Sequence, residues 1–128
     1  MKLNLFNQTR QKINLRKLEK IAELFPDIEG EIELTFVGQA RIRQANLDFR
    51  FKDKPTDVLS FEYAQDDNLL GEILIYPKCY TRTFDEIDRL IIHGILHILG
   101  YDHEGDETEA QEMETIQEHL LAKFRSKK

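Results

Sequence analysis

Three of the four histidines of this chain lie close together, at positions 93, 97 and 103. His93 and His97 are four residues apart, so on a helix both side chains would project from one face and could bind one metal ion. His103 lies beyond the reach of that helix, but Gly100 stands between them, and glycine commonly ends a helix and reverses the chain. The spacing therefore predicts one divalent ion bound by His93, His97 and His103, with an open fourth position as in catalytic zinc sites.

The residue after the first histidine limits the chemistry of such a site. The histidines and Gly100 have the spacing of the zinc-protease signature His-Glu-x-x-His-x-x-Gly-x-x-His, in which the glutamate is the general base. Here that position is Gly94, which cannot accept a proton. Zinc on three imidazoles could still lower the pKa of water to about 7, and imidazoles also suit nickel, copper and iron. We therefore predict a hydrolytic metal site, with zinc as the first candidate, that lacks the base of a peptidase.

Length and composition limit the class of protein. The chain has 128 residues, 41% of them hydrophobic and 33% charged, so we expect one soluble globular domain over 1–128. No apolar run approaches the length of a membrane span, and we expect no secretory signal at the start. The single cysteine, Cys79, excludes an internal disulfide and fits a reducing cytoplasm.

Charge is unevenly distributed along the chain. The formal net charge is −6, which argues against indiscriminate nucleic-acid binding, and residues 102–118 are strongly acidic. A basic cluster lies upstream, formed by Arg41, Arg43, Arg50, Lys52 and Lys54. Phosphate binding requires a local positive surface and not a basic whole. The cluster is therefore either a solvated face or a binding site for phosphates.

Hydrophobic periodicity predicts the elements that position these residues. Strands are expected where apolar and polar residues alternate, over 3–6, 31–37, 58–63 and 70–76, and the last two form a hairpin. Helices are expected over 14–25, from an Asn14 cap to Pro26, over 39–49 and 106–124, and in a histidine helix that begins near Thr83 or Asp85. This order predicts an α/β (α+β) sandwich, in which one mixed sheet of about four strands is packed with helices. The metal site would lie at the end of the histidine helix.

Three blocks of the sequence together resemble one family. Residues 93–103 match the signature His-Gly-x-Leu-His-x-x-Gly-Tyr-Asp-His of the YbeY family of bacterial metal-dependent endoribonucleases. Residues 49–61, Phe-Arg-Phe-Lys-Asp-Lys-Pro-Thr-Asp-Val-Leu-Ser-Phe, are similar to the other hallmark block of that family. Residues 70–75 are similar to its Leu-Gly-Asp-Ile strand, with Glu72 at the aspartate position. The order and separation of the blocks agree, so the resemblance covers most of the chain after residue 30.

The resemblance implies a zinc-dependent, single-strand-specific endoribonuclease that acts on ribosomal RNA, notably at the 3′ end of the small-subunit RNA, and in ribosome quality control. Within the matching block, Arg50 is the candidate catalytic residue, because a guanidinium can stabilise the negative charge that builds on two phosphoryl oxygens. Asp102, next to His103, could orient that ligand by hydrogen bonding. Four neighbouring cations would bind the substrate: Lys52, Lys54, Arg41 and Arg43.

Two other classes of function stay open at this point. A zinc peptidase would need a carboxylate from elsewhere in place of Gly94, for which Glu72 is the candidate. A noncatalytic module would use the metal as a staple and dock onto ribosomal proteins or assembly factors. A fourth ligand from the protein would favour the staple, whereas an open position beside a basic groove would favour the nuclease.

Overall fold

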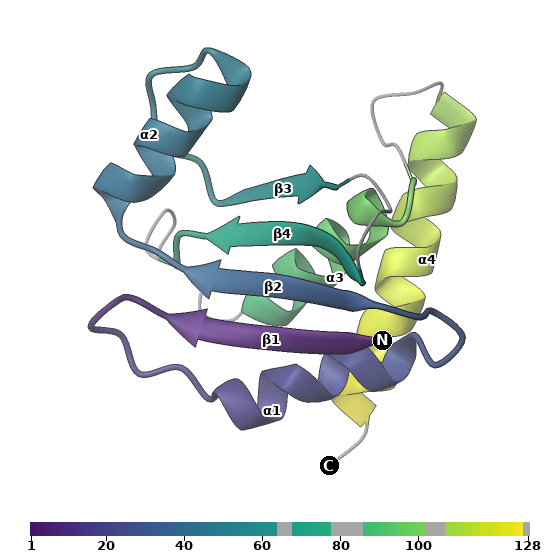
Figure 1. Cartoon of the computed structure of the whole chain (residues 1–128). Helices are drawn as coiled ribbons and strands as arrows, with labels where there is room; N and C mark the ends of the chain where they lie inside the picture. The colour runs from purple at the N-terminus through teal and green to yellow at the C-terminus, as the bar shows by residue number, and fades with distance from the viewer. Residues whose placement is uncertain (64–67, 78–85, 102–106, 127–128) are drawn as a thin grey trace.

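The computed structural model describes residues 1–63, 68–77, 86–101 and 107–126. One sheet has the strand order β1-β2-β4-β3, and its strands are β1 (Lys2–Asn7), β2 (Glu31–Phe36), β3 (Val58–Glu62) and β4 (Leu69–Ile75). β1, β2 and β4 run parallel, and β3 pairs antiparallel with β4 at one edge (Figure 1). The predicted four-stranded mixed sheet and its hairpin are therefore confirmed.

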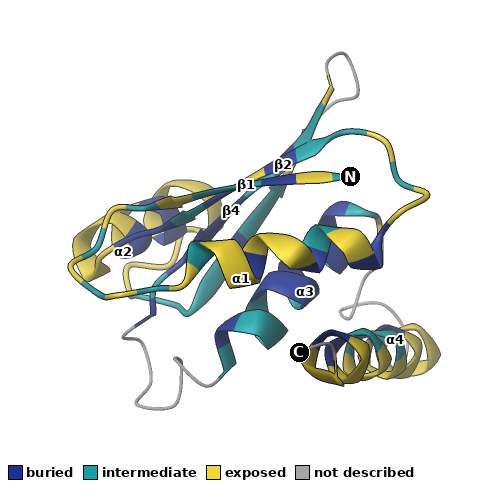
Figure 2. Cartoon of the chain, turned by 90° about the horizontal axis from the view of Figure 1, so that it is seen from below, coloured by how far each residue is buried: buried dark blue, intermediate teal, exposed yellow. Residues whose placement is uncertain are grey.

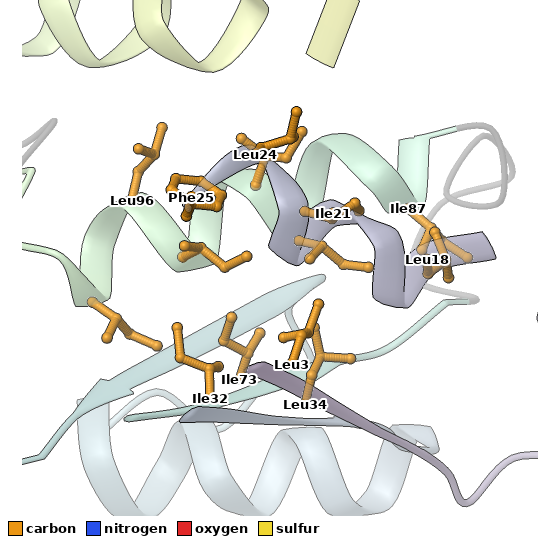
Figure 3. Close-up of a cluster of buried hydrophobic side chains, with 14 of the residues drawn as sticks. Leu3, Leu18, Ile21, Leu24, Phe25, Ile32, Leu34, Ile73, Ile87 and Leu96 are labelled. Atoms are coloured by element: carbon orange, nitrogen blue, oxygen red, sulfur yellow. The ribbon is translucent and has the colours of Figure 1, made fainter. Parts of the chain in front are cut away.

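Helices cover both faces of this sheet. α2 (Gln39–Arg50) lies on one face, while α1 (Leu15–Glu19), the 3₁₀ helix η1 (Lys20–Leu24) and α3 (Ile87–Ile98) lie on the other. The long helix α4 (Glu107–Ser126) packs on the outer side of α3 (Figures 2 and 3). The sandwich expected from the sequence is confirmed, and the histidine helix α3 is a middle layer between the sheet and α4.

The helix expected from Asn14 to Pro26 is instead two short pieces, α1 and η1. Asn14 caps α1 as predicted, since its Oδ1 accepts a hydrogen bond from the Lys17 N–H at 3.1 Å. The chain then tightens into η1, at whose end the Phe25 N–H donates to the Ala22 carbonyl at 3.1 Å. Pro26 disfavours helical backbone at the residue before it, so the helix ends in a tight 3₁₀ turn and not in further α-helix.

The main hydrophobic core fills the space between the sheet and α3. Ile32, Leu34 and Ile73 rise from the sheet toward α1 and α3 (Figure 3). α3 is apolar nearly all round because α4 packs against the side away from the sheet. Its start expected at Thr83 or Asp85 lies outside the described residues. Among the described helices none is long and apolar enough to cross a membrane, α3 included.

A second, smaller core lies between the sheet and α2. α2 is amphipathic, and the alternate residues of β3 and β4 that point away from α3 meet its apolar stripe. This cluster consists of Val37, Ile42, Ala45, Leu59 and Leu74. The histidine helix thus covers one face of the central strand β4 and the edge strand β3, and α2 covers the other face.

Candidate active site

α3 places two of the predicted metal ligands side by side. His93 and His97 are both half-buried, and their ring centroids are 4.7 Å apart in a T-shaped arrangement. Two imidazoles this close can each turn one nitrogen toward a shared ion, with zinc–nitrogen distances of about 2.0–2.1 Å. The four-residue spacing therefore does bring this pair together, while its use as a metal site stays a prediction.

A hydrogen bond from α4 sets the tautomer of the His93 ring. Glu118 accepts two hydrogen bonds from Arg89, both at 3.0 Å, and this bonding lowers the pKa of Glu118, so the carboxylate is charged and can only accept. Gln117 must therefore turn its amide nitrogen toward Glu118, 3.2 Å away, and its amide oxygen toward His93 Nδ1, 2.7 Å away. Nδ1 then donates to that oxygen, so in the neutral ring Nε2 carries the lone pair, which is the tautomer that a metal ligand of this kind has.

The end of α3 turns the chain as the sequence predicts. Gly100 has a φ of +103°, its N–H donates to the His97 carbonyl at 3.1 Å, and the next N–H donates to the Leu96 carbonyl at 3.0 Å. This is a Schellman motif, whose left-handed residue is usually glycine. His103 and Asp102 lie outside the described residues, so their parts in the site stay predictions. Within the described residues alone, no group of three ligand side chains gathers for a metal.

Gly94 faces the core, where no catalytic base could act. A Cβ at this position would lie 2.9 Å from Ile73 Cδ1 and 3.3 Å from two further carbons of the same fully buried side chain. The glycine therefore lets α3 approach β4 closely. The residue that the sequence shows only as a missing base thus has a packing role of its own.

Glu72, the candidate replacement base, points away from the histidine helix. It is next to Ile73 on β4, so its side chain projects from the opposite face of the sheet. There it accepts a hydrogen bond from the Tyr63 hydroxyl at 2.6 Å, and this bond raises the pKa of Tyr63 to about 12. Glu72 therefore cannot replace the base missing at Gly94, and the peptidase alternative loses its candidate residue.

Arg50 lies at the end of α2, which covers the face of the sheet opposite to the histidine helix. It is the last residue of α2, it is exposed, and it forms no ion pair with a described residue. Its neighbour Phe49 packs against Phe61 of β3, with ring centroids 4.8 Å apart. α3 packs against the other face of β3 (Figure 1). β3 therefore lies between α2, whose last residue is Arg50, and α3, which carries the histidine pair, so these two parts of the candidate site are on opposite faces of the sheet.

The basic cluster lies on the exposed side of α2 and on the loop after it. Asn46 is buried, and its Nδ2 donates to the Lys54 carbonyl at 2.8 Å, which holds the loop against the helix. Arg43 forms a two-pronged ion pair with Asp53 at 2.7 and 3.1 Å; this bonding raises the pKa of Arg43 and lowers that of Asp53. Arg43 therefore secures the loop. Besides Arg50, three cations of the cluster are exposed and form no ion pair within the described part of the chain: Arg41, Lys52 and Lys54.

Almost the whole chain matches one protein family. Residues 3–125 match the family model described as Endoribonuclease YbeY. This chain belongs to the YbeY family. The Endoribonuclease YbeY of Thermodesulfovibrio yellowstonii is 41% identical over 106 residues, which are 73% of this chain and 67% of that protein. Those of Persephonella marina and Francisella philomiragia are 40% and 35% identical, over 85% and 97% of this chain and 80% and 91% of their own lengths.

A solved structure agrees with this assignment. The solution structure of TM1509 from Thermotoga maritima superposes with a TM-score of 0.59 and 25% sequence identity. The match covers 97% of this chain and 92% of that one, so the whole sandwich is shared and not only the histidine helix. The family resemblance carried by the three sequence blocks is therefore confirmed.

Two residues that hold the candidate site in place were not among those predicted from the sequence. Gln117 gave no local signal, because its contact with His93 joins two helices across 24 residues of chain. Asn46 did leave a signal, since it lies at helical spacing from Ile42 and Phe49 on the apolar side of α2. A polar residue at such a position indicates a buried hydrogen bond.

Proposed function

We propose that this chain is a metal-dependent endoribonuclease that cleaves single-stranded RNA in the cytoplasm, in maturation of the 3′ end of the small-subunit ribosomal RNA and in ribosome quality control. Ribosomal proteins or assembly factors are its further proposed partners. Relatives at 35–41% identity are named endoribonucleases, which favours this reaction over a peptidase or a noncatalytic metal staple. The observation that carries the proposal is the His93–Gln117 hydrogen bond, because metal-ligating histidines characteristically donate their other ring N–H to such an acceptor.

The proposed cofactor is one divalent ion per chain, zinc first and nickel as the alternative, on His93, His97 and His103. The donors fit, because two imidazoles already lie together and the hydrogen bond of Nδ1 to Gln117 gives His93 the tautomer with its lone pair on Nε2. When bound, such an ion supplies a Lewis acid that acidifies water or polarises a phosphoryl oxygen. The part of the chain is to orient the rings, through Gln117 for His93 and, as we propose, through Asp102 for His103.

Arg50 is the proposed catalytic residue of the chain itself. Cleavage of a phosphodiester builds negative charge on the phosphoryl oxygens, and the planar fork of a guanidinium binds two such oxygens at once. Its exposure at the end of α2 supports this role, as does the lack of an ion pair with any described residue. The exposed cations Arg41, Lys52 and Lys54 would bind neighbouring phosphates of the same strand, on a loop that Arg43 and Asn46 hold in place.

Cleavage of defined substrates by the metal-reconstituted chain tests this proposal. Zinc-loaded and chelator-treated protein would each be given a single-stranded RNA, a duplex of the same sequence, and casein. We expect zinc-dependent cleavage of the single strand only. Casein hydrolysis would support the peptidase, and stoichiometric metal binding without cleavage of any substrate would support the metal staple.

A further inference from the structure

Phe51 is the one residue other than glycine with a positive φ in the described part of the chain, at 59°. Its ψ of 32° places it in the left-handed region, which a Cβ disfavours and which glycine or asparagine usually occupies. Its side chain is also 87% exposed, the largest exposed fraction among the large apolar residues described. A bulky aromatic residue is thus held in a disfavoured conformation and in water.

Folding does not account for a phenylalanine at this position. The turn is held by backbone groups, since the Phe51 N–H donates to the Leu47 carbonyl at 3.1 Å and the Lys52 N–H donates to the Asn46 carbonyl at 3.3 Å. Neither bond needs a side chain at position 51, and a ring this exposed buries little apolar area. Glycine would make the same turn with less strain. Strained backbone of this kind is commonly retained at sites that bind another molecule. We therefore expect a binding partner of the ring outside the folded chain.

The surroundings of Phe51 are those of a site for single-stranded nucleic acid. Arg50 and Lys52 flank it, are exposed, and form no ion pair with a described residue. Phe49 is 64% exposed, and its ring is braced by Phe61. Residues 39–54 carry five cations and two carboxylates in a chain whose net charge is −6, so this segment attracts a polyanion that the rest of the chain repels. Aromatic rings set between cations suit unpaired bases, which stack on the rings while the cations bind the phosphates.

We propose that Phe51 is a stacking platform for an unpaired base of the RNA substrate, completed by Phe49 and the flanking cations. This inference rests on the proposed function and deepens it, because it gives a preference for single strands a physical origin. Bases in a duplex are already stacked and paired, so they cannot lie flat on the ring. The same end of α2 would then bind a base through Phe51 and a phosphate through Arg50. Every base has a π face, so the platform tolerates any sequence.

Equilibrium binding without cleavage tests the platform. The chelator-treated chain is titrated into a fluorescein-labelled single-stranded RNA, and the anisotropy is followed. Phe51→Gly should weaken binding about 5- to 150-fold, the range expected from the loss of one base–aromatic stack. Its thermal unfolding midpoint should not fall, because glycine suits the backbone at this position. Phe6→Ala is the matched control, since Phe6 is 49% exposed on the opposite edge strand, and its RNA affinity should equal that of the wild type.

Two further readouts identify the base as the partner of the ring. An RNA with abasic sites throughout its central segment lacks the stacking surface, so the wild type and Phe51→Gly should bind it alike. The chain contains no tryptophan, so Phe51→Trp introduces a single fluorescent reporter. Single-stranded RNA should quench its emission while a duplex should not, and the affinity for the single strand should be kept or raised.

The outcomes separate the platform from the reaction. Unchanged RNA affinity in Phe51→Gly, or tryptophan emission that does not respond to single-stranded RNA, overturns the platform even where the metal-loaded chain cleaves RNA. Binding that depends on Phe51, in a chain that cleaves no RNA when loaded with metal, supports the platform and contradicts the endoribonuclease. A wild-type chain that binds no single-stranded RNA overturns both.

Discussion

The C-terminal ends of α2 and α3 both need a residue with left-handed backbone, but the two helices use very different residue types there. Each helix ends at a left-handed residue whose neighbouring N–H groups satisfy the last carbonyls, Phe51 at a φ of +59° and Gly100 at +103°. A Cβ on Gly100 would meet nothing within 4 Å, so the backbone alone and not crowding requires the glycine. At Phe51 a similar backbone conformation carries a ring into water. One end only turns the chain, whereas the other turns the chain and, as we propose, binds a base.

The two helices also differ in how firmly they are embedded. α3 buries seven of its twelve residues and α2 buries three of its twelve (Figure 2). A metal site needs ligands fixed to within about half an ångström, which a helix buried between a sheet and α4 can supply. An RNA strand needs an accessible, charged surface, which the exposed side of α2 supplies. The comparison therefore predicts that changes on α3 affect the metal and changes at the end of α2 affect the RNA.

The largest effect is expected on the buried helix. His97→Ala should abolish metal binding and RNA cleavage together, because it leaves at most two of the three proposed imidazoles. Metal content after dialysis and the cleavage rate are measured on the same preparation. His119→Ala is the control, since His119 is exposed on α4, and it should keep both. A His97→Ala chain that retains one equivalent of metal would remove His97 from the site.

Substitution of Arg50 at the end of α2 should give the next largest effect, on the rate of RNA cleavage and not on metal binding. Arg50→Lys keeps the charge but loses the bidentate fork, so single-turnover cleavage should fall about 10²–10³-fold with metal content unchanged. Arg16→Lys, at an exposed arginine of α1, is the matched control and should cleave normally. Near-normal cleavage by both Arg50→Lys and Arg50→Ala would leave Arg50 as a helix-end residue without a part in the reaction.

Substitutions of Gln117 test whether the packing of α4 on α3 also orients the proposed metal ligand His93. Gln117→Leu removes the acceptor for His93 Nδ1, so the metal affinity should fall about 10–100-fold. In the metal-free protein, ¹⁵N shifts of the His93 ring should change from one tautomer to a mixture. Gln117→Glu keeps an acceptor oxygen and should restore the tautomer, while Gln111→Leu, on the exposed side of α4, should change neither measurement. An unaltered tautomer in Gln117→Leu would show that another group orients the ring.

A smaller effect is expected from the loop that follows α2. Reversing both charges in Lys52→Glu/Lys54→Glu should weaken RNA binding and flatten its dependence on salt, because each lost phosphate contact lowers the log–log slope by about 0.7. Affinity is measured over a series of salt concentrations. Lys20→Glu/Lys123→Glu changes the net charge equally at exposed positions elsewhere and should keep the slope. Equal slopes in both double variants would place the RNA on another surface.

The sequence predicted those parts of the molecule that follow from local rules. The strands, the Asn14 cap and the turn at Gly100 were found because each is set by a backbone requirement that a residue type reveals. The strand order and the His93–Gln117 contact were not, because they depend on how distant segments pack. The left-handed backbone of Phe51 cannot be predicted from the sequence, because only glycine and asparagine commonly indicate that conformation.

The smallest expected effects test the comparison of the two helix ends most directly. Gly100→Ala puts a Cβ on a backbone with φ of +103° and should lower the free energy of unfolding by about 1–2 kcal/mol. Phe51→Gly relieves strain but gains freedom in the unfolded chain, and these terms, each about 1 kcal/mol, nearly offset one another. Urea unfolding of the metal-free proteins measures both, because metal binding would add its own stabilisation.

Phe51→Ala separates the contribution of the ring to the free energy of unfolding from that of the left-handed backbone. It keeps a Cβ in the left-handed region and removes the ring, so its free energy of unfolding should equal that of the wild type to within about 0.5 kcal/mol, as for other exposed substitutions. Its RNA affinity should nevertheless fall as far as that of Phe51→Gly. If Phe51→Ala instead unfolds as readily as Gly100→Ala, the ring stabilises the fold, and the two helix ends differ in packing and not in function. If stability is kept and RNA affinity is lost, the ring is held at this position for what it binds.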